Sequence, residues 1–280
     1  MAPTAAMAAT ATVAPVPTAT DPLTVRTLRQ IVADAHTELI EPPADGRVFT
    51  QTARAGLADC APSGRVRLDA LARLLQDVAY ADVEDAELAD TAVWVVRRCR
   101  IRVERFPRFG ERLTLHTFCS GIGRAWAERR TTIESALPGG ARASVVEAVA
   151  LWVHLNPATL HPAPLSDREL EVYGVGAAGE RKVSHRLRHP APPAETDGAR
   201  PWTFRATECD LADHVNNAAY WAPLEDELLT SSEPDPDSID VELEFRAPAQ
   251  PGNKRILASG DRRWIVDPGG ELHASLLIAR

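Results

Sequence analysis

The amino-acid sequence predicts an α+β fold built from two domains. Its 280 residues are close to twice the length of a common domain, and 45% of them are hydrophobic, which is enough material for buried cores. Apolar residues recur with helical spacing over residues 68–82, and strand-like segments follow this helix. A second helix followed by strands can be traced after residue 200. Helices and strands that are segregated along the chain in this way are typical of the α+β class.

The N-terminal residues do not belong to either domain. Residues 1–21 are rich in Ala, Pro and Thr, have no charge before Asp21, and lack the continuous apolar core of a signal peptide, so we expect a disordered tail. Residues 22–46 are expected to form a helical extension, because Leu23 to Ile40 shows helical spacing before Pro42 and Pro43 end it. No run approaches the length of a membrane span.

The first domain is expected over residues 47–165. Its helix is marked by Leu68, Leu71, Leu75 and Val78, which recur on one helical face. Strands are predicted at Trp94–Val103, Arg112–Cys119, Ala125–Glu134 and Ser144–Leu155, with turns at Phe109-Gly110 and Pro138-Gly139-Gly140 between them.

The second domain is expected over residues 200–280, after a linker at 166–199 that is rich in Pro and Gly. A first strand is predicted at Trp202–Thr207, a helix at 216–230, and further strands at Ser238–Ala247, Lys254–Ser259, Arg262–Asp267 and Glu271–Ile278. Pro223 lies inside the predicted helix, where it should kink or shorten it.

The segment from Glu208 to Trp221 concentrates the polar chemistry of the chain. If its first half is extended, Glu208, Asp210 and His214 share one face. A helix start near Asn216 and Asn217 follows, and its free N–H groups suit a carbonyl oxygen that gains negative charge. The alternative interpretation is that Asp210 is a turn residue, His214 an ordinary polar residue, and the asparagines helix caps.

The same segment resembles the Asp-Leu-Asp-x-Asn-x-His-Val-Asn-Asn signature of the acyl-ACP thioesterases. Further similarities keep the order of the family and lie at Arg67–Ala79, Trp94–Arg97, Arg105–Glu111, Ala150–Val153 and Asn156–Thr159. The resemblance implies two tandem hotdog domains, each an antiparallel sheet wrapped around a central helix. It also implies that residues 47–165 bind the acyl chain and that residues 200–280 carry the catalytic group.

The catalytic group of that family comprises the second Asp, the Asn, the His and a later Glu. Asp210 and His214 match the Asp and the His, whereas the Asn falls on Ala212 and the Glu on Pro248. The adjacent Cys of the family falls on Ala249, which excludes a cysteine nucleophile at that position.

The predicted site therefore consists of Asp210, His214 and Asn216. We expect His214, alone or through Asp210, to activate a water molecule, and N–H groups near Asn216 and Asn217 to stabilise the oxyanion. Glu208, Glu242 and Glu244 are candidates to replace the missing Glu.

The resemblance implies hydrolysis of fatty acyl-ACP to free fatty acid and ACP. The losses at Ala212 and Pro248 keep open a second interpretation, a hotdog protein that binds acyl groups or a carrier without hydrolysis. A hotdog dehydratase, which also uses a His and an acid, is the third.

Charge and cysteine content limit the partners. A net charge of -8 argues against nucleic acid, but residues 97–130 hold ten arginines and three acids, a surplus that could dock acidic ACP or the phosphates of CoA. The alternative is that these arginines form the solvent face of a strand. Four widely spaced cysteines indicate reduced thiols in the cytoplasm, and no metal or redox cofactor is implied. Two fused hotdogs already supply internal pairing, so a monomer or a homodimer is expected.

Overall fold

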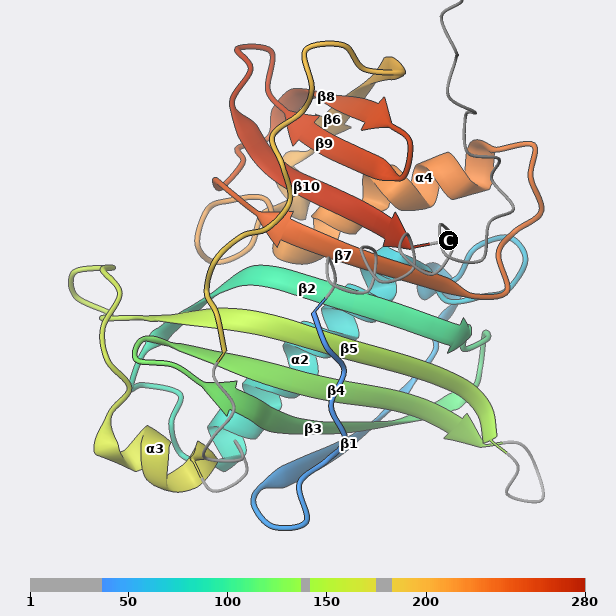
Figure 1. Cartoon of the computed structure of the whole chain (residues 1–280). Coiled ribbons are helices and arrows are strands. Elements are labelled where there is room, and N and C mark those ends of the chain that lie inside the picture. Colours follow the sequence, from blue (N-terminus) through green and yellow to red (C-terminus); the bar gives the residue numbers. More distant parts are fainter. Residues whose placement is uncertain (1–36, 137–141, 175–182, 280) are drawn as a thin grey trace, which may run out of the picture. The chain divides into compact units, whose positions relative to one another are not determined.

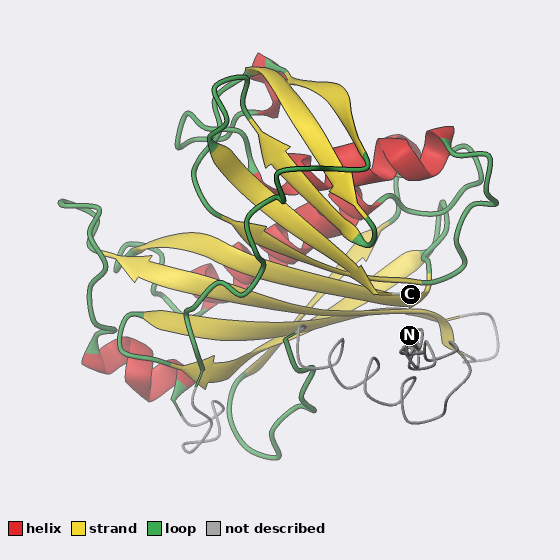
Figure 2. Ribbon diagram, turned by 45° about the horizontal axis from the view of Figure 1, so that its top comes forward, coloured by secondary structure: helices red, strands yellow, loops and turns green. Residues whose placement is uncertain are grey.

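The computed structural model of the chain describes residues 37–136, 142–174 and 183–279. Within these residues, ten strands form one antiparallel sheet in the order β1-β3-β4-β5-β2-β7-β10-β9-β8-β6 (Figure 1). The central pair, β2 and β7, joins a five-stranded N-terminal half to a five-stranded C-terminal half. The sheet curves around the helices α2 and α4, which lie on its concave side (Figure 2). This is the α+β tandem hotdog that the resemblance implies.

The N-terminal half wraps around one long helix, α2 (Leu68–Asp85). Leu68, Leu71, Leu75 and Val78 are buried against the sheet, so the helical face that the sequence predicts is the one that packs. The strands are β1 (Val48–Arg54), β2 (Val93–Arg105), β3 (Arg112–Ile122), β4 (Trp126–Ala136) and β5 (Arg142–Leu155).

In the C-terminal half, the expected helix at 216–230 is divided into η3 (Asn217–Trp221), a 3-10 helix, and α4 (Ala222–Thr230). Pro223 lies in the first turn of α4, where a missing N–H costs no hydrogen bond, so the proline separates the two segments. The strands are β6 (Gly198–Phe204), β7 (Ile239–Phe245), β8 (Gly252–Ser259), β9 (Arg262–Val266) and β10 (Leu272–Ala279).

One hydrophobic core runs through both halves. It includes Leu71 of α2 and Ile101 of β2 together with Trp221 of η3 and Leu243 of β7. The helices are also tied by charge, because the buried Arg65 pairs with Glu225 of α4 at 2.8 Å. Glu225 in turn accepts the N–H of Leu68 at 3.0 Å and thereby caps α2 from the opposite half.

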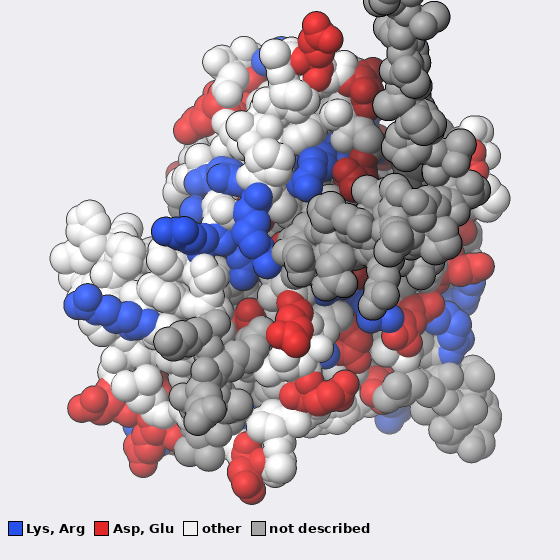
Figure 3. Space-filling model, in the orientation of Figure 1, with Lys and Arg blue, Asp and Glu red and all other residues white. Residues whose placement is uncertain are grey.

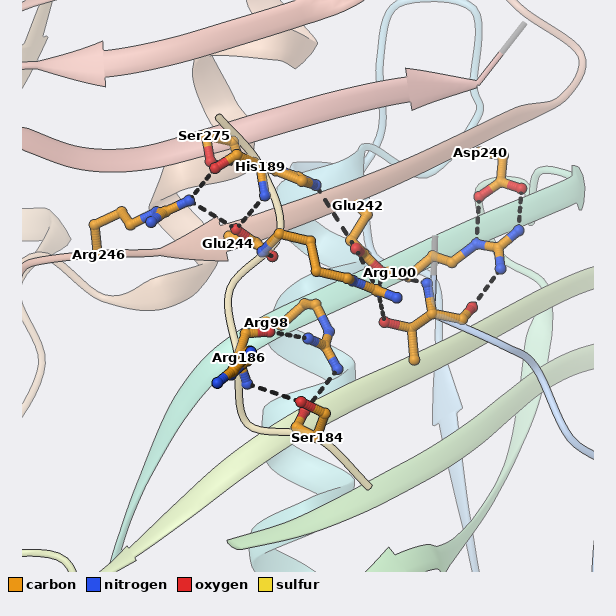
Figure 4. A network of polar contacts seen from close by, with 12 residues as sticks. Arg98, Arg100, Ser184, Arg186, His189, Asp240, Glu242, Glu244, Arg246 and Ser275 are labelled. Carbon is orange, nitrogen blue, oxygen red and sulfur yellow. Dashed lines mark hydrogen bonds and ion pairs between the residues drawn. The ribbon is translucent and has the colours of Figure 1, made fainter. Parts of the chain in front are cut away.

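The outer face of the β2–β7 junction carries a charged seam (Figure 4). Period-two alternation directs Val241 and Leu243 into the core and the acids Asp240, Glu242 and Glu244 to the other face. Facing them on β2 are the arginines of the predicted basic segment, with Arg98 opposite Glu244 and Arg100 opposite Glu242.

Residues 183–190 cross this seam and bury it. The backbone N–H groups of Arg188 and His189 both donate to Glu244, at 2.5 and 2.9 Å. The Arg188 guanidinium donates to Glu242 at 3.0 Å, and Arg98 donates to the carbonyl of Arg186. Arg98 is therefore buried and bound. Neither interpretation of the basic segment, a solvent face or a docking surface for a carrier, holds for this arginine.

The segment that precedes the first hotdog also joins the seam. Residues 22–36 of the predicted helical extension lie outside the described residues, and residues 37–46 are not helical. Thr37 instead donates its N–H to Glu242 at 2.7 Å, and its carbonyl accepts from Arg100 at 2.5 Å. The helix expectation is therefore wrong for Thr37 to Ile40, because charged side chains of the sheet bind this backbone in place of helical partners.

The predicted linker at 166–199 begins with a helix, α3 (Asp167–Tyr173). Ser166 and Glu169 form a capping box in which each side chain binds the backbone N–H of the other residue, a sequence signal that the linker prediction overlooked. None of the described helices combines the length and the apolar character needed to cross a membrane.

Candidate active site

The predicted site lies in a tight loop between β6 and η3. A 3-10 turn, η2 (Ala206–Glu208), leads into an isolated bridge between Cys209 and Val215. Inside the bridge, the N–H of Asp210 donates to the carbonyl of His214 at 3.0 Å, and the N–H of Asp213 donates back to Asp210 at 3.0 Å. Asp213 has a φ of 57°, a left-handed conformation that Asp tolerates better than most residues. The segment is a turn and not the extended strand that the alternation of Glu208, Asp210 and His214 suggests.

Asp210 and Asn216 are brought together by this turn. The Asp210 carboxylate accepts the N–H of Ala212 at 2.9 Å and the side-chain amide of Asn216 at 3.0 Å. Asn216 uses its own side-chain oxygen to accept the N–H of Ala218 at 2.8 Å, which makes it the N-cap of η3. Asp210 therefore fixes the residue that starts the helix.

His214 belongs to the same loop but not to this hydrogen-bond chain. Its backbone closes the turn, and its half-buried ring has no hydrogen bond to any described residue. The Asp210 carboxylate does not bind the imidazole. The ring is thus free to bind a ligand or water, whereas the Asp210 carboxylate is bound to Ala212 and Asn216.

Two cavities lie in the N-terminal half, and one of them reaches η3. The proximal cavity, about 420 Å³ including its open mouth, begins at Asn217 and Ala218 in the first turn of η3. Between α2 and the sheet it is lined mainly by apolar groups such as Leu75, Val96 and Phe245. The distal cavity, about 530 Å³ measured in the same way, is lined by Tyr80, Trp94 and Tyr173 among others, and shares Arg129 and Trp152 with the proximal one. An apolar path of this shape suits a flexible hydrocarbon chain.

Comparison with known protein families shows which family has this fold. The family model for the acyl-ACP thioesterase N-terminal domain matches residues 46–173, and the model for the C-terminal domain matches residues 193–261. The chain belongs to the acyl-ACP thioesterase family.

Relatives of this thioesterase occur in bacteria and plants. An uncharacterized protein of Mycobacterium tuberculosis is 28% identical over 88% of the chain and 98% of its own length. A chloroplast acyl-[acyl-carrier-protein] hydrolase of Cuphea viscosissima is 24% identical over 82% of the chain, which spans 58% of that longer protein.

Solved structures show the same fold. An acyl-ACP thioesterase of Bacteroides thetaiotaomicron has a TM-score of 0.65 at 18% identity, covering 83% of this chain and 98% of that one. The 12:0-ACP thioesterase of Umbellularia californica has a TM-score of 0.62 at 19% identity, covering 84% and 98%.

The loop that contains the family's Glu and Cys positions is held against the site. Pro248 is exposed, whereas Ala249 is buried and bound on both sides. Its carbonyl accepts the N–H of Val215 at 2.9 Å, and its N–H donates to the Tyr220 hydroxyl at 2.9 Å. Burial raises the pKa of the Tyr220 phenol to about 12, so this clamp stays neutral across the physiological range.

None of the three glutamates considered as substitutes for the missing Glu is free in this thioesterase. Glu208 accepts the N–H of Arg205 at 2.5 Å and caps η2. Glu242 and Glu244 point to the outer face of the sheet, away from the helices, and are bound in the seam. The alternation of β7 predicts that these two share a face, but it does not say which face.

The N-terminal half contains a second copy of the site loop. There, η1 (Leu57–Asp59) leads into a bridge between Cys60 and Val66, as η2 leads into the bridge between Cys209 and Val215. The N–H of Ala61 donates to the carbonyl of Arg65 at 2.8 Å, in the manner of Asp210 and His214. Gly64, with a φ of 86°, takes the position of Asp213. Arg65 stands where His214 stands, so the N-terminal copy lacks the histidine.

Two groups of side chains in the described residues have the spacing of metal ligands. His189, Glu242 and Glu244 form one, but Arg98, Arg188 and Arg246 surround them and neutralise the carboxylates. Asp267, Glu271 and His273 form the other, in which Asp267 accepts N–H groups of its own turn. Backbone hydrogen bonds lower the pKa of Asp267 without any ion. The carboxylates of the first group and Asp267 of the second therefore have protein partners in place of a metal.

Proposed function

We propose that this protein hydrolyses the thioester of a fatty acyl-ACP to free fatty acid and ACP. The observation that carries the proposal is the proximal cavity, which is lined by Asn217, three residues after His214, and continues as a mainly apolar path between α2 and the sheet. A thioester at the mouth of this cavity would have its carbonyl beside the site loop and its hydrocarbon chain inside the N-terminal half.

In the proposed reaction, His214 acts as the general base. It takes one proton from a water molecule whose oxygen attacks the thioester carbon. The C–S bond of the tetrahedral intermediate then breaks, and the protonated His214 returns this proton to the leaving sulfur, which yields the carrier thiol and the fatty acid. Asp210 supports the reaction indirectly, because it holds Asn216 and Asn216 holds the start of η3. No metal or redox cofactor is part of this scheme.

The backbone N–H of Asn217 is the proposed donor to the oxyanion. The N–H of Asn216 already donates to Glu208, and that of Ala218 donates to the Asn216 side chain. Asn217 has no such acceptor among the described residues, and it lines the proximal cavity. A hydrogen-bond donor that is already in position stabilises the transition state more than one that must reorient during the reaction.

A basic patch beside the charged seam is suited to the carrier. Arg97, Arg186, Arg188 and Arg246 form this patch, and basic side chains gather where residues 183–190 cross the seam (Figure 3). Burial lowers the pKa of Arg97, and the like charge of Arg246 lowers it further. An acidic protein or a phosphate would relieve this repulsion, which supports ACP, with CoA as the other carrier.

We further propose that the protein is a monomer or a homodimer in the cytoplasm. The internal pairing of the two halves is compatible with a monomer, and a homodimer remains the other expectation. All four cysteines carry free thiols, which supports a cytoplasmic location.

A second function, binding without hydrolysis, is favoured by Ala212 and Pro248. Neither side chain can supply the polar groups that the family places there. In this case the chain would retain an acyl-ACP intact.

The experiment that separates these functions is product analysis on purified protein given acyl-ACPs and acyl-CoAs of several lengths. The proposal expects free thiol and free fatty acid in equal amounts. Stoichiometric retention of intact acyl-ACP would contradict it and support the binding function, and an enoyl product would identify a dehydratase.

A further inference from the structure

The duplicated site loops share one constant spacing. Corresponding residues lie 149 positions apart, the difference between Cys60 and Cys209 and also between Val66 and Val215. The same difference relates η1 to η2, and it relates Leu68, the first residue of α2, to Asn217, the first residue of η3. Each half therefore repeats the order of 3-10 turn, bridged loop and helix, and residues can be paired across the repeat.

In the N-terminal copy, the loop residue is bound by the helix of the other half. Arg65 donates to Glu225 of α4 at 2.8 Å. The same carboxylate accepts the N–H of Leu68, the first residue of α2, at 3.0 Å. Glu225 thus joins the loop side chain to the free N–H at the helix start.

The spacing pairs Arg65 with His214, Leu68 with Asn217, and Glu225 with Gln76. The duplication therefore predicts that Gln76 of α2 lies opposite His214 and the N–H of Asn217, as Glu225 lies opposite Arg65 and the N–H of Leu68. The contacts observed in the N-terminal copy thus predict how the corresponding residues are arranged at the candidate site.

The lining of the proximal cavity supports the same placement independently. Gln76 and Asn217 both line it. Two other polar side chains of the lining are engaged, since Thr131 binds Thr117 at 2.9 Å and Arg129 binds Asp82 at 2.6 Å. The half-buried Gln76 has no hydrogen bond to any described residue, so its amide is available to a ligand.

We infer that Gln76 is a further catalytic residue, which binds the attacking water together with His214. The role rests on the proposed thioester hydrolysis. The water donates one hydrogen to the His214 ring and the other to the side-chain oxygen of Gln76, which leaves a lone pair directed at the thioester carbon. Gln76 supplies the polar partner that Ala212 and Pro248 no longer provide. In the N-terminal copy, the Arg65–Glu225 ion pair fills this place.

The first test measures steady-state kinetics of Gln76→Leu and Gln76→Glu on an acyl-ACP. We expect Gln76→Leu to lower kcat about 10–100-fold with little change in KM, because water orientation and not substrate binding is lost. Gln76→Glu keeps the acceptor and should retain most of kcat. Asp77→Asn, the adjacent exposed position on α2, is the control and should match the wild type. An unchanged kcat in Gln76→Leu overturns the catalytic role.

The second test measures proximity and needs no hydrolysis. The double variant Gln76→Glu with His214→Arg copies the ion pair of the N-terminal half into the active site. Its Tm should exceed the sum of the single-variant effects by about 2–4 °C, the shift that one modest charge interaction produces in a protein of this size. Additive Tm values would overturn the contact between Gln76 and His214. Because this readout is independent of turnover, failure of the contact is distinguishable from failure of the proposed hydrolysis.

Discussion

Asp210 binds Asn216 and not His214, because Asp213 turns the chain between them. Period-two alternation places Asp210 and His214 on one face of a strand, but a left-handed residue at 213 converts that strand into a loop. The hydrogen bonds of Asp210 and Asn216 follow the alternative interpretation, a turn and a cap. Of the three predicted site residues, only His214 has a side chain without a hydrogen bond to a described residue.

This arrangement predicts that Asp210 and Asn216 act as one unit. Asp210→Ala, Asn216→Ala and the double variant should each lower kcat by a similar factor, about 10–100-fold, since removing either residue releases the start of η3. The measurement is kcat on an acyl-ACP, with Asp213→Asn as the control from the same loop. A severe loss in Asp210→Ala beside a mild one in Asn216→Ala would show that Asp210 acts on His214 directly.

Gln76 illustrates what single residues in the sequence could not disclose. It lies on a well-predicted helix, inside the family-like segment Arg67–Ala79, but nothing in that segment singles it out. The signal that identifies it is the equal spacing of the two Cys-to-Val bridges, and this becomes visible only when both loops are seen to have the same hydrogen bonds.

The positions of most helices and strands can be predicted from sequence periodicity. Which face of a strand is buried, and where two elements join, cannot be predicted in this way. Alternating segments predict β2 to β5 closely, because each strand has one face in the core and turn residues at its ends. The helix at 216–230 is divided by Pro223, whose effect the sequence predicts without the exact position of the break. Seam residues such as Glu242 and Glu244 are correctly placed on one face, but their burial depends on residues 183–190, which have no periodic pattern at all.

A buried ion pair at the junction of the two cavities predicts how the chain length of the substrate is limited. Arg129 of β4 binds Asp82 of α2 at 2.6 Å, and its guanidinium lies 5.5 Å from the Tyr173 ring. This charge borders an otherwise apolar path. We expect Arg129→Leu with Asp82→Leu to open the distal cavity and to raise the preference for palmitoyl-ACP over octanoyl-ACP in kcat/KM by about tenfold or more.

The matched control is the pair Arg130–Glu147, which joins adjacent strands at 2.6 Å and does not line either cavity. Arg130→Leu with Glu147→Leu should leave the preference unchanged. If both double variants shift the preference equally, the ion pair at the cavity junction does not set chain length.

At the scale of the whole molecule, the charged seam holds the two halves and residues 183–190 together. Burial alone would raise the pKa of Glu242, but the His189 ring 3.6 Å away and the charges of Arg188 and Arg98 outweigh it and lower the pKa to about 2. A carboxyl whose pKa is lowered by folding stabilises the fold when the pH is above the pKa of the unfolded state. This contribution is lost as the pH falls toward the pKa of the folded state. The seam should therefore weaken between about pH 5 and pH 2.

The corresponding variant is Glu242→Gln. Urea unfolding at pH 7 should show a loss of about 3 kcal/mol, since a buried partner of several cations is removed. The difference from the wild type should narrow as pH falls below about 4.5, where the wild-type carboxyl begins to give up its contribution. Glu171→Gln, on the exposed surface of α3, is the control. A difference that stays constant down to pH 2 would contradict the role of this carboxylate.

The decisive experiment compares thiol release from acyl-ACP by His214→Ala with release by the wild type and by His161→Ala, which replaces an exposed histidine in the loop after β5. We expect His214→Ala to keep the wild-type Tm and to lower turnover by about two to four orders of magnitude, the usual contribution of a general base. His161→Ala should behave as the wild type. Undiminished thiol release by folded His214→Ala would contradict the proposed mechanism.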